Sequence, residues 1–137
     1  MTRMPPIATL FAFTLLILIS LSVSAATLTC PPSLPSTHPG FEQVGPVPTA
    51  HWQLKDMRLF DGPPGEETKP APAQLAPDGT VTHQGGHTST WKFGGKENLL
   101  VVCAYNGSAT YYRARPNPPP KLCTLRQDRG LTRGWCD

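Results

Sequence analysis

The chain has 137 residues, enough for one domain and too few for two typical ones. Its 12 Lys and Arg residues against 9 Asp and Glu residues give a formal net charge of +3 at pH 7. That charge is too weak to argue for a nucleic acid or an anionic membrane as partner, so neither is expected on this ground.

The first 25 residues have the features of a cleaved export signal. Arg3 supplies a positive charge, an apolar run follows over 7–23, and Val23-Ser24-Ala25 offers small residues at a cleavage site. Cleavage leaves a periplasmic or secreted chain of 112 residues without a stable membrane anchor. The apolar run is nearly long enough to span a bilayer, so a retained anchor is the alternative.

The four cysteines all follow this signal, at Cys30, Cys103, Cys123 and Cys136. An oxidising compartment and the lack of a Cys-x-x-Cys pair favour two disulfides over a zinc site, with three connectivities open. We favour Cys123–Cys136, which closes a short loop, and Cys30–Cys103, which ties the N-terminal segment to the most apolar strand. The cysteines are therefore expected to be structural.

Two zones rich in proline and glycine are predicted to be irregular. Residues 26–50 contain six prolines, which fix φ and remove donors, so we expect an extended N-terminal arm without inner strands. A single β domain is expected over 51–137. Within it, the turn residues of 62–87 predict a second long loop.

Strand signals dominate the rest of the chain. Met57 and Leu59 lie at odd positions and Leu54 at an even one, so a regular strand would turn them to opposite faces. This change predicts a strand with a bulge near Lys55-Asp56. A short helix is the competing interpretation there. Further strands are predicted over 89–93, 122–126 and 134–136.

The strongest local signal is a hairpin. Asn106-Gly107 separates the apolar run 99–105 from 108–115, which is typical of a type I′ turn. This turn predicts that Cys103 lies opposite Thr110 and that Val101 lies opposite Tyr112. Because both faces of 99–105 are apolar, the strand is predicted to be central and covered on both sides.

No segment has a helical period over ten residues or more. The sum predicts a mainly β fold, a small antiparallel meander, sandwich or open barrel of five or six strands with long Pro/Gly-rich loops and two disulfides.

Candidate catalytic groups are sparse. His83 and His87 have a spacing that would suit a metal on a helix, but Gly85 and Gly86 between them oppose a helix. Glu66 and Glu67 are adjacent carboxylates in a loop. These four residues define the enzymatic alternative, an envelope hydrolase or metal-dependent enzyme, whereas our expectation is no catalytic site, no metal and no cofactor.

Basic residues crowd the last quarter of the chain. They form either a solvated strand face or a binding surface for an acidic partner, made of Arg113, Arg115, Arg126, Arg129 and Arg133. We therefore expect a non-catalytic binding module whose partner is an envelope or host protein.

The order of motifs carries a resemblance. An early Cys30-Pro31-Pro32 is followed by Gly62-Pro63-Pro64-Gly65-Glu66, the hairpin Val102-Cys103-Ala104-Tyr105-Asn106-Gly107, and the two late cysteines. This order resembles a family of small exported bacterial proteins of unknown function that is named only after an enterobacterial locus tag. The resemblance implies a Gram-negative periplasmic or secreted location and structural cysteines, and it supplies no catalytic residues.

Overall fold

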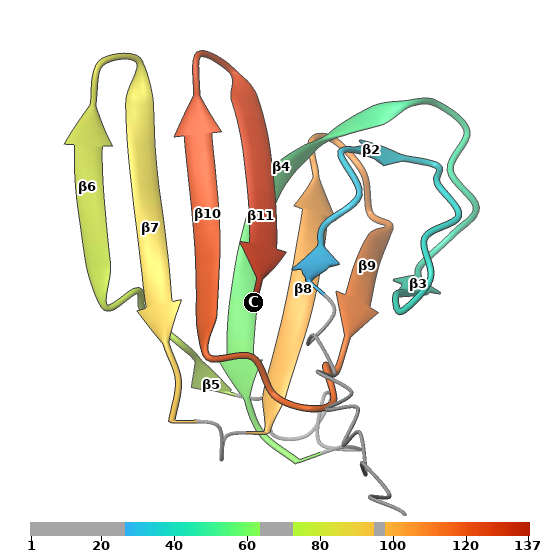
Figure 1. Cartoon of the computed structure of the whole chain (residues 1–137). Coiled ribbons are helices and arrows are strands. Elements are labelled where there is room, and N and C mark those ends of the chain that lie inside the picture. Colours follow the sequence, from blue (N-terminus) through green and yellow to red (C-terminus); the bar gives the residue numbers. More distant parts are fainter. Residues whose placement is uncertain (1–26, 64–72, 95–97) are drawn as a thin grey trace, which may run out of the picture.

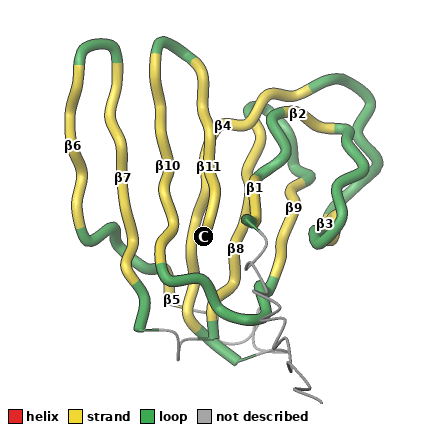
Figure 2. The backbone as a smooth tube through the Cα atoms, in the orientation of Figure 1, coloured by secondary structure: helices red, strands yellow, loops and turns green. Residues whose placement is uncertain are grey.

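The computed structural model describes residues 27–63, 73–94 and 98–137. The predicted export signal, Glu66 and Glu67 lie outside these residues. The described chain consists of strands and loops (Figure 2). None of it forms a helix that could cross a membrane.

The strands form two antiparallel sheets, with β4 passing behind β11 in Figure 1. The five-stranded sheet has the order β1 (Leu28–Thr29), β11 (Leu131–Cys136), β10 (Leu122–Asp128), β7 (Gly86–Lys92) and β6 (Gly79–His83). The six-stranded sheet has the order β2 (Ser33–Leu34), β4 (Trp52–Asp61), β8 (Leu99–Tyr105), β9 (Tyr111–Ala114) and β3 (Glu42–Val44), with β5 (Ala73–Gln74) paired to β4. The predicted mainly β, antiparallel fold is confirmed.

The core lies where the two sheets meet. Side chains alternate across each strand, so that β4 and β8 turn Met57, Leu59 and Val101 inward, while β7 contributes Trp91. A Cβ at Gly134 of β11 would lie 2.9 Å from the Met57 sulfur. The glycine therefore allows the backbone of β11 to approach β4 closely.

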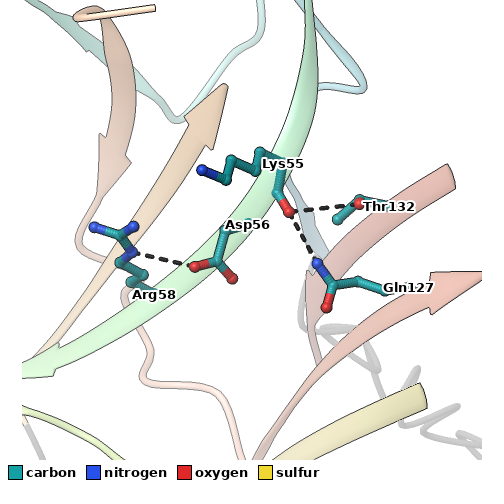
Figure 3. A network of polar contacts seen from close by, with 5 residues as sticks. All are labelled: Lys55, Asp56, Arg58, Gln127 and Thr132. Atoms are coloured by element: carbon teal, nitrogen blue, oxygen red, sulfur yellow. Dashed lines mark hydrogen bonds and ion pairs between the residues drawn. The ribbon is translucent and has the colours of Figure 1, made fainter. Parts of the chain in front are cut away.

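The predicted bulge in β4 is confirmed, and the competing helix is wrong. The register of β4 against β8 shifts between Leu54 and Asp56. The Lys55 carbonyl there accepts hydrogen bonds from Gln127 Nε2 at 3.0 Å and Thr132 Oγ1 at 3.5 Å (Figure 3). Since these side chains belong to β10 and β11, the bulge joins the two sheets.

Both disulfides have the favoured pairing, Cys30–Cys103 and Cys123–Cys136. Cys123 and Cys136 lie directly opposite each other on β10 and β11. Cys30 has a different role, because its N–H donates to the Gly134 carbonyl of β11 at 2.9 Å while its sulfur binds β8. The Cys30–Cys103 bond therefore links one sheet covalently to the other.

The proline-rich segment before β4 begins at the edge of the five-stranded sheet, with β1, and then adds β2 and β3 to the six-stranded sheet. Its short strands β1, β2 and β3 all lie at sheet edges, in keeping with the expected lack of inner strands. The buried Tyr105 hydroxyl donates to the Pro31 carbonyl at 2.6 Å. The Tyr112 hydroxyl donates to the Ser36 carbonyl, and the Thr110 hydroxyl to the Pro46 carbonyl. These bonds satisfy carbonyls in a segment where proline limits regular pairing.

The prediction of a long loop over 62–87 is wrong for part of the described residues in this range. β6 pairs with β7 through a two-residue connection, Gln84-Gly85, where Gly85 has φ +92°. Thr80, Val81 and Thr82 are β-branched and favour a strand. Their strand propensity outweighs the turn residues around them.

The hairpin of β8 and β9 is confirmed, but its turn and register differ from the prediction. Cys103 lies opposite Tyr112, two residues beyond the predicted partner. Gly107 has φ +77° while Asn106 does not have a positive φ, which excludes type I′. The Ser108 hydroxyl accepts a hydrogen bond from the Thr110 N–H at 3.0 Å, and this contact holds residues 108–110 out of the strand. A slip of two residues preserves which side chains share a face.

Candidate functional site

The outer face of the six-stranded sheet is apolar and hollowed. A concavity of about 520 Å³ lies over the middle of β4, β8 and β9. Its apolar side chains share one face by register, and we call them the concave face: Phe60, Leu100, Val102, Ala104 and Tyr111. The volume is within the range of about 300–1,000 Å³ that is usual for ligand pockets.

This face corrects the prediction that the strand 99–105 is covered on both sides. β8 is central, between β4 and β9, as predicted. On its outer face Leu100 is buried, but Val102 and Ala104 are only half-buried. An antiparallel sheet usually turns polar side chains toward water. The apolar residues here therefore mark a surface that suits a partner.

Three cations border the concave face: Lys55, Arg58 and Arg113. Among the described residues that line the concavity, none is a carboxylate. Two carboxylates approach from beside it. The Arg58 Nε donates to Asp56 at 3.1 Å, and the Arg113 Nε donates to Glu42 at 2.8 Å. Such exposed pairs contribute about 0–1 kcal/mol each, so their main effect is to hold the guanidinium groups in place.

Lys55 reaches this border because of the bulge. Its carbonyl is bonded by Gln127 and Thr132 of the other sheet. Its side chain points away from those two residues (Figure 3) and lines the concavity. The residue thus has its backbone in the joint between the sheets and its ammonium group at the concave face.

The turn after β8 forms one wall of the concavity. Gly107 lies beneath the Trp52 ring, where an added Cβ would be 2.8 Å from a ring carbon. Below it, the Tyr105 hydroxyl is fixed on the Pro31 carbonyl. Burial raises the pKa of Tyr105 well above its usual value, with a smaller contribution from Tyr112. The hydroxyl therefore stays protonated at neutral pH and keeps its bond to the Pro31 carbonyl.

The five arginines of the predicted binding surface are divided between the two sheets. Arg113 borders the concave face. Arg115 donates to the carbonyls of Gly62 at 2.6 Å, Pro63 at 3.3 Å and Asn98 at 3.3 Å, so it holds loops together. Arg126, Arg129 and Arg133 belong to the hairpin of β10 and β11, in the other sheet. The structure does not bring the five together into one surface.

The outer face of the five-stranded sheet is polar by comparison. We call it the basic face, and its register places on one side Val81, His83, Thr88, Thr90, Lys92, Leu122, Thr124, Arg126, Asp128, Leu131, Arg133 and Trp135. Arg126 and Arg133 lie directly opposite each other, and Arg126 also donates to Asp128 at 3.3 Å. Val81 and Leu131 are large apolar side chains that are 67% and 58% exposed. Exposed side chains on a charged sheet face are typical of a solvated surface.

The two histidines of the enzymatic alternative are not brought together, and Glu66 and Glu67 lie outside the described residues. His83 lies opposite Gly86 and His87 lies opposite Thr82, so the two imidazoles are on opposite faces of the sheet. His83 Nε2 is 3.2 Å from the Thr88 hydroxyl. Within 27–63, 73–94 and 98–137, no three His, Cys, Asp or Glu side chains are grouped as a metal site would need.

Sequence reasoning missed the concave face. Its signal was present, because 99–105 lacks the alternation of a strand with one wet face. That pattern was interpreted as burial on both sides. The residues Phe60, Tyr111 and Lys55 carried no separate signal.

Comparison with known proteins identifies the chain. Residues 48–137 match the family described as "Type VI secretion system Tli immunity protein". No curated protein and no solved structure matches the chain. The matched residues include every strand that forms the concave face. This named family replaces the family of unknown function that the motifs suggested. Because the match covers more than half of its length, the chain belongs to the type VI secretion system Tli immunity protein family.

Proposed function

We propose that this protein protects its host cell by binding and neutralising a lipase effector that is delivered by type VI secretion. It acts as a stoichiometric, non-catalytic binder. The observation that supports this most is the family match over 48–137, which contains the concave face as a complete unit.

We place this activity in the periplasm. The Cys30–Cys103 and Cys123–Cys136 bonds suit an oxidising compartment, and disulfides are rare in the cytosol. The predicted export signal over residues 1–25 supports the same location. An exported binder would meet an effector that is delivered to the periplasm.

The rigidity of the domain suits a binder that must act at low concentration. Stable protein complexes bury about 1,200–2,000 Å² in total, and ordering flexible side chains or loops lowers the affinity that this area yields. Here the turn at Gly107 is bonded through the Asn106 N–H to the Gln53 carbonyl, and the Lys55 carbonyl of β4 is bonded by Gln127. Little conformational entropy is then lost on binding.

The proposal is tested with the type VI lipase effector of the same strain. The effector is directed to the periplasm of a sensitive Gram-negative host, with or without the full-length protein. We expect the protein to restore viable counts, and the purified mature chain to block phospholipid hydrolysis at a 1:1 ratio. A catalytically inactive effector should still bind, which separates binding from turnover.

A matched control is the chain without residues 1–25, which stays in the cytoplasm. It should fail to protect although the same effector is produced. The proposal is wrong if the exported protein neither protects cells nor binds the purified effector.

A further inference from the structure

We infer that the concave face is the docking site for the effector, and that its occupant is a protruding segment with an apolar tip flanked by carboxylates. This inference rests on the proposed function and names the surface and the chemistry of the contact. The alternative docking surface is the basic face of the other sheet.

The apolar part of the occupant follows from the floor of the concavity. Phe60, Val102, Ala104 and Tyr111 come from three neighbouring strands and are all half-buried in the free protein. Each keeps apolar area that a partner can remove from water. Interface hot spots cluster near the centre of a contact and are enriched in tyrosine and arginine, the residue types of Tyr111 and Arg113 here.

The carboxylates follow from the border. Lys55, Arg58 and Arg113 line the concavity, and none of its described lining residues is acidic. Asp56 and Glu42 offset two of these charges from beside it, while the Lys55 side chain is exposed. A partner with carboxylates around its apolar tip therefore gains charge complementarity at this border, chiefly with Lys55.

The basic face lacks this combination. Its exposed apolar residues, Val81 and Leu131, lie on two strands that are not neighbours, with threonines and charged groups between them. Leu122 and Trp135 are half-buried on the same face, and neither lines a described pocket. No cavity is lined by Arg126 or Arg133 among the described pockets. The concave face is thus the surface on which apolar area, shape and charge coincide.

Two pairs of matched substitutions test the choice of face. The first pair is Val102→Glu on the concave face and Val81→Glu on the basic face. We expect Val102→Glu to weaken effector binding at least about 100-fold, because it buries a charge at the centre of the contact, and Val81→Glu to change it less than about threefold. Binding is measured by biolayer interferometry with the inactive effector, and urea unfolding confirms that each variant folds.

The second pair is Lys55→Glu and Lys92→Glu, both at exposed lysines. It keeps the inference testable should Val102→Glu fail to fold. Lys55→Glu should weaken binding by about tenfold at low salt and less at 0.5 M NaCl, whereas Lys92→Glu should not.

The outcomes separate the two proposals. If the wild-type protein binds the effector and both Val102→Glu and Lys55→Glu bind it with the same affinity, the docking site is wrong and the proposed function stands. Loss of binding in Val81→Glu and Lys92→Glu instead would assign docking to the basic face. If the wild-type protein does not bind the effector, the proposed function itself fails.

Discussion

The two sheets contribute to one core, yet their outer faces differ. The six-stranded sheet presents a hollowed apolar face bordered by cations, and the five-stranded sheet presents threonines and charges around Arg126 and Arg133. Both faces are built by the same alternation of side chains. The difference shows that arginines clustered in the sequence need not form one charged surface: Arg126 and Arg133 lie on the basic face, whereas Arg113 borders the concave face.

The two disulfides also differ in what they connect. Cys30–Cys103 links the two sheets, while Cys123–Cys136 links neighbouring strands of one hairpin. The sequence separations are 73 and 13 residues. Loop entropy therefore predicts that the link between sheets stabilises the fold more.

The largest expected effect tests this inequality. The double variant Cys30→Ala/Cys103→Ala should lose about 4 kcal/mol of unfolding free energy, and Cys123→Ala/Cys136→Ala about 3 kcal/mol. Urea denaturation of the two variants beside wild type measures both losses. A larger loss in the hairpin variant would contradict the view that the sheets depend on Cys30 for their attachment.

A second prediction concerns pH and the inner face of the six-stranded sheet. The pKa of Tyr105 is raised by burial, so the folded state holds this proton more tightly than the unfolded state. Its contribution to stability is complete below pH 10 and is lost as the pH rises above that value, with a slope of about 1.4 kcal/mol per pH unit.

The variant Tyr105→Phe tests this slope. It should be less stable than wild type at pH 8 by about 1 kcal/mol, because the bond to the Pro31 carbonyl is lost. The difference should shrink between pH 10 and 11, as wild type loses its advantage. Tyr111→Phe, on the concave face of the same hairpin, is the control and should follow the wild-type dependence. A constant difference across this pH range would contradict the prediction.

The smallest expected effect lies on the basic face. Arg133→Glu replaces a like-charge pair opposite Arg126 with an opposite-charge pair, and should raise stability by about 0.2–1 kcal/mol. Arg133→Gln should give part of this gain. The urea midpoint at low salt measures both, and a loss of stability would show that Arg133 has a structural partner that charge reversal disrupts.

Local patterns predicted much of the fold. The change of parity between Leu54 and Met57 located the bulge, and the spacing of the cysteines favoured the observed pairing. The register of the hairpin was missed, because residues 108–110 are held out of the strand by the bond between Ser108 and Thr110, and Thr110 also donates to the Pro46 carbonyl, 64 residues away. The concave face was also missed, because whether Val102 is covered depends on which sheet lies over it, and not on β8 itself.

The bulge at Lys55 has a consequence for how the protein can change over generations. The joint that this residue makes uses its main-chain oxygen, so any amino acid at position 55 can supply it. Its side chain lies at the border of the proposed contact. A lineage could therefore exchange this side chain to follow a changing toxin without loosening the two sheets, and specificity could drift there at little cost in folding.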